Sequence, residues 1–156
     1  MGFNVSADAY MRFMGRYSEP LAARFAELAG IHRGQRVLDV GCGPGPLTAF
    51  WSAVRELDPS ADDESGLAGV REGHLAELFA QAGLGAAQVT ALTVRVRYDR
   101  FEQWWEPLTL GVGPAGSYVA SLAADRRAAL REQCRRQLPA DPVEISATAW
   151  AAVSRI

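Results

Sequence analysis

The sequence predicts a single α/β domain, and three observations lead to that fold class. The chain has 156 residues, a hydrophobic fraction of 49% and a charged fraction of 22%, which suits one ordinary globular domain. A short apolar run between glycines indicates a buried strand of a parallel sheet, and two later segments alternate apolar with polar residues. Segments with helical spacing separate the strands. We therefore expect one parallel-type strand, two C-terminal antiparallel strands and flanking helices within residues 1–156.

The three predicted strands differ in how much of their surface is buried. Arg36–Val40, bounded by Gly34 and Gly41, is short and apolar, which is typical of a strand covered on both faces. Val89–Tyr98 and Val143–Val153 each place apolar side chains on one face and polar ones on the other. We therefore expect the last two strands to be half-exposed.

Six segments have the spacing of amphipathic helices. They are Ser18–Leu28, Pro46–Leu57, Glu72–Ala82, Phe101–Leu108, Pro114–Leu122 and Asp125–Leu138. In the first, Ser18 is expected to be the N-cap, Pro20 is tolerated in the first turn, and Gly30 ends the helix. A shorter helix is expected upstream, over 10–17, with Gly15 weakening it.

Composition argues against several classes of partner and site. The net charge is −2 and the pI is near 5.7, so general binding to nucleic acid or anionic membranes is not expected. The basic side chains are all Arg, which excludes a Schiff-base or Walker-type lysine within this sequence. Cys42, Cys134, His32 and His74 lack metal-ligand spacing, so no metal site is expected. We expect both thiols to be free and both histidines to be exposed.

The N-terminal residues do not resemble a secretory signal, and no apolar run reaches 18 residues. We therefore expect a cytoplasmic protein without a membrane span. The last predicted helix carries several arginines, which we interpret as a solvated face over a stripe formed by Leu130, Cys134 and Leu138. These arginines are Arg126, Arg127, Arg131, Arg135 and Arg136.

One motif carries chemistry. In the segment Asp39–Gly45, an acidic residue near the end of a predicted strand precedes a turn with glycines at alternate positions, and a helix follows. Glycines let the backbone turn sharply and approach a ligand closely, and the start of a helix offers N–H groups to an anionic group. This order of strand, acid, glycine turn and helix predicts a small-molecule site.

The stretch Val37–Gly45 resembles the first motif of the class I S-adenosylmethionine-dependent methyltransferases. Tyr10–Ser18 resembles the N-terminal region of the small-molecule branch of that superfamily. The resemblance implies a Rossmann-like fold, S-adenosyl-L-methionine as cofactor and a small-molecule methyl acceptor. It also implies that the cofactor is lined by Asp39, Gly41, Cys42, Gly43 and Gly45, with weaker candidates for covering it in Tyr10, Arg16 and Tyr17.

The sequence departs from the family pattern after the glycine motif. The acid expected about 20 residues later has no counterpart, because Asp62, Asp63 and Glu64 follow a helix and a turn rather than a strand. We interpret them as a solvated loop. Helix Glu72–Ala82 and the two alternating strands resemble the end of the family's domain, where the strands are antiparallel partners. The fold class expected is thus a truncated Rossmann-like domain, joined near 46–52 and lacking about a hundred middle residues.

This deficit leaves the first predicted strand without its usual neighbours. Its backbone groups must pair with Val143–Val153 or with a second chain, so a homodimer is one expectation. Cofactor affinity is expected to be weak. Trp104 and Trp105 fit a substrate pocket and plain core packing equally well. No residue is assigned as general base.

Three interpretations of function therefore follow from the sequence. The first is a small-molecule methyltransferase or a shortened derivative of one. The second is a non-catalytic α/β remnant or interaction module that associates with itself. The third is the product of an internal deletion in a larger gene.

Overall fold

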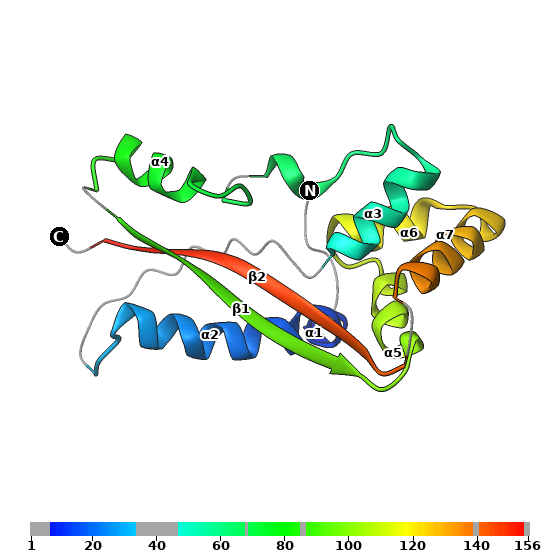
Figure 1. Ribbon diagram of the computed structural model, residues 1–156, viewed down its shortest axis with the longest axis horizontal. Coiled ribbons are helices and arrows are strands. Elements are labelled where there is room, and N and C mark those ends of the chain that lie inside the picture. Colours follow the sequence, from blue (N-terminus) through cyan, green and yellow to red (C-terminus); the bar gives the residue numbers. More distant parts are fainter. Residues whose placement is uncertain (1–6, 34–46, 68, 85–86, 139–140, 155–156) are drawn as a thin grey trace.

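The computed structural model describes residues 7–33, 47–67, 69–84, 87–138 and 141–154 (Figure 1). Its elements are α1 (Ala7–Tyr10), η1 (Met11–Gly15), α2 (Arg16–Ala29), α3 (Thr48–Leu57), η2 (Glu64–Gly66), α4 (His74–Gln81), β1 (Gln88–Tyr98), α5 (Phe101–Trp105), η3 (Glu106–Leu110), α6 (Gly113–Ser121), α7 (Ala124–Gln137) and β2 (Val143–Val153). Within the described residues the chain is thus a helical protein with one two-stranded antiparallel sheet. The strand predicted at Arg36–Val40 lies outside them.

Strands β1 and β2 pair antiparallel over their whole length, from Gln88 opposite Val153 to Tyr98 opposite Val143. This confirms both alternating segments as strands and confirms that they are antiparallel partners. One face of the ribbon is buried, and its buried residues are Val94, Tyr98, Val143, Ile145, Ala147 and Ala151. The other face exposes polar side chains such as Arg95. The alternation of the sequence therefore correctly predicts which face is covered.

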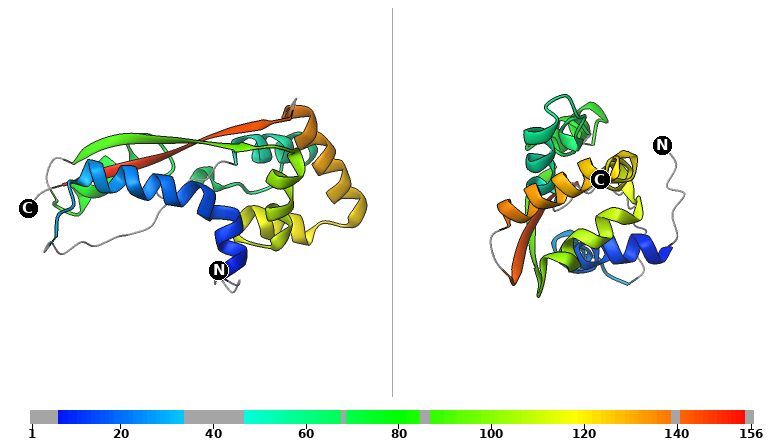
Figure 2. Two further views of the ribbon diagram at one scale, coloured as in Figure 1. Left: turned by 90° about the horizontal axis from the view of Figure 1, so that it is seen from below. Right: turned by 90° about the vertical axis from the view of Figure 1, so that its right-hand side faces the viewer.

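Helices cover this ribbon unevenly along its length (Figures 1 and 2). Helix α2 runs along the ribbon and packs mainly on β1. Helices α3, α5, α6 and α7 gather at the end where Tyr98 faces Val143, whereas α4 lies over the opposite end. No described helix has both the length and the apolar character that crossing a bilayer requires.

The N-terminal helices differ from the sequence prediction at their boundary. Ser18 is not an N-cap, because α2 already begins at Arg16 and Gly15 is the residue before it. The π-helical turn η1 joins α1 to α2, so the backbone stays helical through the expected boundary. Pro20 therefore lies inside α2 rather than in its first turn, and its missing N–H removes the helix bond to the carbonyl of Arg16. Gly30, in the left-handed conformation, ends the helix as predicted.

The other helices agree with prediction to within a few residues. Helix α4 begins at His74 rather than Glu72, and it buries only Leu75 fully. The predicted helix Phe101–Leu108 is a short α-helix followed by the 3-10 turn η3, which contains Pro107. Helices α6 and α7 correspond to the last two predicted helices.

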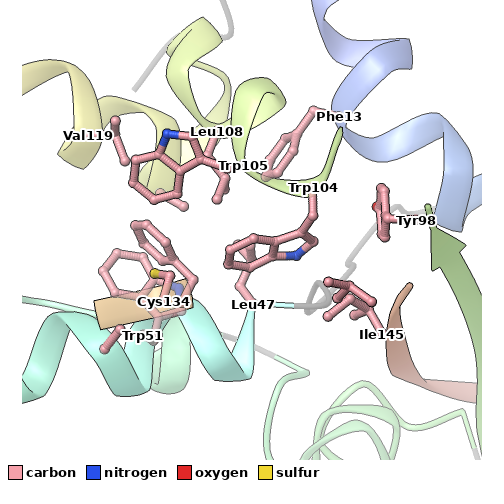
Figure 3. Close-up of a cluster of buried hydrophobic side chains, with 14 of the residues drawn as sticks. Phe13, Leu47, Trp51, Tyr98, Trp104, Trp105, Leu108, Val119, Cys134 and Ile145 are labelled. Carbon is pink, nitrogen blue, oxygen red and sulfur yellow. The ribbon is translucent and has the colours of Figure 1, made fainter. Parts of the chain in front are cut away.

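The main core lies between the apolar face of the ribbon and the helices at one end of it (Figure 3). Large side chains with essentially no exposed surface come from several elements: Phe50, Val54, Phe101, Leu108, Val112, Val119, Leu130 and Cys134. Phe101 lies 5.6 Å from Trp104 and 6.3 Å from Trp105, ring centre to ring centre. All three rings come from α5, and the guanidinium groups of Arg131 and Arg135 on α7 each lie 5.4 Å from the centre of the Phe101 ring.

A buried pair of tyrosines fastens the N-terminal helix to the sheet. The hydroxyls of Tyr17 on α2 and Tyr98 on β1 are 2.5 Å apart and hydrogen-bonded, and each residue is nearly inaccessible to solvent. The guanidinium of Arg16 lies 5.1 Å from the centre of the Tyr98 ring. Burial, the largest cause, raises the pKa of Tyr17 and of Tyr98 above the ordinary value of 10.0.

Because of this tyrosine pair, we predict that the free energy of unfolding falls at alkaline pH. Below pH 10 both hydroxyls are protonated in the folded and unfolded states, and their full contribution is present. Above that pH the unfolded chain loses protons at its ordinary tyrosine pKa while the folded chain keeps them, so stability falls as the pH rises towards the raised folded pKa values. Urea unfolding at a series of pH values measures this. The double variant Tyr17→Phe/Tyr98→Phe should show a flatter decline, and an equal decline would contradict the assignment.

Candidate functional site

The residues predicted to line a cofactor, Asp39, Gly41, Cys42, Gly43 and Gly45, lie outside the described residues. Leu47, the first described residue after this motif, is buried with 6% exposure and directly precedes α3. Thr48 begins α3, so the predicted helix after the glycine motif is present from that point. The first turn of a helix has backbone N–H groups without intrahelical partners. This turn is therefore the described part of the predicted motif.

A cavity of about 380 Å³ opens beside this turn. We call it the α3 groove, and it is lined by Thr48, Ala49, Ser52, Gln137, Glu144, Ile145 and Ser146. Three elements thus meet here: the start of α3, the end of α7 and the start of β2. The Gln137 amide is held by the Glu56 carboxylate, to which its nitrogen donates over 2.9 Å, and it lies 3.5 Å from the Ser52 hydroxyl.

The α3 groove offers hydroxyl groups, an amide and one carboxylate around an open volume. The carboxylate of Glu144 can attract a cation, while the N–H groups at the start of α3 favour an anion. Such a combination can hold a ligand that carries both charges. The volume lies within the usual range of small-molecule sites.

Tyr10, Arg16 and Tyr17, the residues predicted to cover the cofactor, lie on the N-terminal helices α1 and α2. Tyr17 is 2% exposed, and its hydroxyl is occupied by Tyr98. Arg16 stacks on the ring of Tyr98, and Tyr10 is 39% exposed on the short helix α1. None of the three lines the α3 groove. Tyr17 and Arg16 have structural contacts that account for their positions.

Trp104 and Trp105, for which pocket lining and core packing were equal alternatives, are core residues. They are 3% and 6% exposed, and Figure 3 shows their indoles among apolar side chains from other elements. Neither residue lines the α3 groove. The geometry therefore favours packing over substrate binding.

Several smaller predictions have clear outcomes. Cys134 is a free, buried thiol, and burial raises its pKa to about 12, which makes it a poor nucleophile. His32 is exposed as expected, but His74 is not, because it is half-buried at the start of α4 and its Nδ1 accepts a hydrogen bond from the Gly69 N–H over 3.4 Å. Among the described residues, no group of three or more side chains could hold a metal ion.

The acidic loop and the arginine-rich helix, both predicted to be solvated, also make contacts within the protein. Asp63 bonds Ser65 and Arg55, and Glu64 accepts a hydrogen bond from the Trp51 indole over 3.0 Å. On α7, Arg131 pairs with Glu102 at 2.8 Å. Leu130 and Cys134 form its buried stripe, and Leu138 packs against the core from just beyond the helix.

Sequence reasoning missed a second cavity, which lies beyond the C-terminal end of α3. We call it the Asp58 pocket; its volume is about 200 Å³ and it is lined by Leu57, Asp58, Tyr118, Leu122, Arg126, Ala129 and Leu130. The turn Asp58-Pro59-Ser60 was a visible signal for a fixed carboxylate. Nothing in the sequence indicates that Tyr118 and Arg126 meet it, because these residues come from different helices.

Comparison with known proteins adds no relative. No family model matches the sequence, and no curated protein or solved structure matches it either.

Replacing Trp104 by alanine tests its place in the core. Trp104→Ala should lower the free energy of unfolding by about 3–5 kcal/mol, because it leaves a cavity among buried side chains. Trp150→Ala is the matched control, since Trp150 is only half-buried on β2, and it should cost about 1 kcal/mol. Chemical denaturation followed by circular dichroism measures both. Equal costs for the two variants would show that Trp104 is not a core anchor.

Proposed function

We propose that this chain binds S-adenosyl-L-methionine through the segment Asp39–Gly45 and the adjoining start of α3, and that it is a small-molecule methyltransferase or a shortened derivative of one. The observation that carries the proposal is the sequence Asp39-Val40-Gly41-Cys42-Gly43-Pro44-Gly45 directly before a helix. The antiparallel pairing of β1 with β2 supports it, because the same resemblance implies that pairing. The truncated Rossmann-like fold is part of this proposal.

The described residues fit the chemistry of this cofactor. Its amino-acid end carries a carboxylate and an ammonium group, and its sulfonium is cationic. The N–H groups of the first α3 turn suit the carboxylate, and the Glu144 carboxylate suits a positive group. Hydroxyls of Ser52 and Ser146 add neutral hydrogen-bonding groups at the same cavity.

When bound, the cofactor supplies an activated methyl group for in-line transfer to an O, N or C nucleophile. The chain's own task is then to orient the two reactants and to exclude water. At one wall of the α3 groove the Gln137 amide donates to Glu56 and lies 3.5 Å from the Ser52 hydroxyl, which favours orientation over proton transfer. No described residue is assigned as general base.

Binding is expected to be weak, for a physical reason. Asp63 and Glu64 are held by Arg55 and Trp51 in a surface loop, so they do not supply the acid that would bind ribose hydroxyls. Tyr17 is occupied by Tyr98. The remaining contacts come from the glycine motif and the α3 groove.

Calorimetry with S-adenosylhomocysteine tests this proposal. We expect saturable binding in the range of about 0.1–1 mM for the unaltered chain. Gly43→Val should abolish it, because a branched side chain blocks close approach of the ligand to the backbone. Gly66→Val is the matched control, since a Cβ at Gly66 meets nothing within 4 Å, and it should bind normally. No binding at millimolar ligand, or equal loss in both variants, would remove the proposal.

A second candidate function is self-association, and the outer edge of β2 favours it. Within the described residues each strand pairs only with the other, so each has one outer edge. Over Val143–Val153 the only charged side chain is Glu144, whereas β1 carries Arg95 and Arg97. Edge strands without charges, prolines or bulges readily pair with another chain. Strand β2 is therefore the edge through which we propose that two copies pair.

Light scattering after gel filtration tests self-association, with a dimer expected at micromolar concentration. Thr148→Lys places a charge at the middle of β2 and should shift the protein towards monomer. Thr93→Lys is the matched control, because Thr93 faces Thr148 across the sheet and both variants lose the same 2.8 Å hydroxyl contact. A monomeric wild type, or equal effects of the two variants, would reject pairing through β2.

A further inference from the structure

The Asp58 pocket combines apolar walls with two opposite charges. Leu57 and Asp58 end the α3 segment, Tyr118 comes from α6, and Arg126 and Leu130 come from α7. Asp58, which carries a carboxylate, and Arg126, which carries a guanidinium group, both line the cavity. Among the ion pairs of the described residues, none joins Asp58 to Arg126. The two charged residues therefore line the same cavity without a direct ion pair, and the charge of Arg126 contributes to lowering the pKa of Asp58.

The carboxylate of Asp58 is held in one orientation. Its Oδ1 accepts hydrogen bonds from the N–H of Ser60 over 3.2 Å and from the hydroxyl of Ser60 over 2.7 Å. Its Oδ2 lies 3.5 Å from the hydroxyl of Tyr118. The Ser60 hydrogen bonds, as the largest cause, hold the pKa of Asp58 below its ordinary value, so the group is anionic at neutral pH.

Tyr118 is fixed in turn by aromatic neighbours. Its ring centre lies 6.4 Å from that of Phe50 and 6.0 Å from that of Trp51, both of which are buried on α3. One wall of the pocket is therefore anchored in the main core. Asp58 and Tyr118 are thus fixed before binding and lose little entropy when a ligand arrives.

These features define the class of ligand. A volume of about 200 Å³ lies below the usual range of drug-sized ligand sites, so the pocket suits a small molecule. Asp58 repels a simple anion, and Arg126 repels a simple cation, whereas a zwitterion satisfies both. Leu57, Leu122 and Leu130 provide apolar surface for a branched hydrocarbon side chain.

We propose that the Asp58 pocket binds a small apolar α-amino acid, with its ammonium group on Asp58, its carboxylate on Arg126 and its side chain against the leucines. This site is separate from the α3 groove. The groove lies at the first turn of α3 and the pocket at its last residue, and a helix of 10 residues is about 15 Å long. The proposal therefore does not rest on methyltransferase activity.

Titration with L-leucine, followed by calorimetry and by backbone amide NMR shifts, tests the proposal. We expect saturable binding at up to millimolar concentration, with shifts confined to the ends of α3, α6 and α7 that form the pocket. 4-Methylpentanoate lacks the ammonium group and 3-methylbutylamine lacks the carboxylate, so each should bind about tenfold or more weakly. No shifts in the pocket up to about 20 mM leucine, or equal binding of either analogue, would overturn the proposal.

Two variants of one helix provide a matched comparison. Arg126→Gln should weaken leucine binding about tenfold or more, because it removes the partner of the carboxylate. Arg136→Gln changes another exposed arginine of α7 that does not line the pocket, and it should bind leucine normally. Arg126 and Arg136 are both exposed, so both variants should unfold at the wild-type temperature. A third variant, Asp58→Asn, tests the proposed contact with the ammonium group independently and should also weaken leucine binding. Equal affinity of Arg126→Gln and wild type would reject the assignment.

Discussion

The structure depends on the antiparallel pairing of β1 with β2. These strands are separated in the chain by α5, α6 and α7, and their pairing brings both ends of that segment together beside Tyr98 and Val143. A two-stranded ribbon alone is marginally stable in water, so it requires helices on its apolar face. Helix α2, from the N-terminal part of the chain, packs along the ribbon. Helices α3, α5, α6 and α7 gather at the end of the ribbon where Tyr98 faces Val143. Fold and cavities follow from that arrangement.

Helix α3 connects the two cavities. Its buried face carries Phe50 and Val54 into the core, which fixes the helix, while its ends remain accessible. The start of α3 borders the α3 groove and adjoins the glycine motif, and its end borders the Asp58 pocket. Each cavity also needs α7, at Gln137 in one case and Arg126 in the other. Both proposed sites thus depend on the packing of α3 against α7.

The small sheet explains why the two proposed functions are linked. A methyltransferase domain built on two strand–helix halves would cover the edges of these strands with further strands. Here the described sheet contains two strands, and β2 carries no charged residue or proline after Glu144. The proposed weak cofactor binding and the proposed pairing through β2 therefore share one physical origin, the small number of strands in the described sheet.

The sequence alone determined most of the described secondary structure and the buried face of the ribbon, because these depend on local patterns. Alternation in β1 and β2 predicted Val94 and Ile145 as buried, and helical spacing predicted α3, α6 and α7 within a few residues. Tertiary packing decided the rest. It placed Trp104 and Trp105 in the core, made Ser18 an interior helix residue rather than a cap, and gave Tyr17 a partner in Tyr98. The meeting of Asp58, Tyr118 and Arg126 also arose only there, because contacts between distant segments depend on how helices pack and leave no local pattern in the sequence.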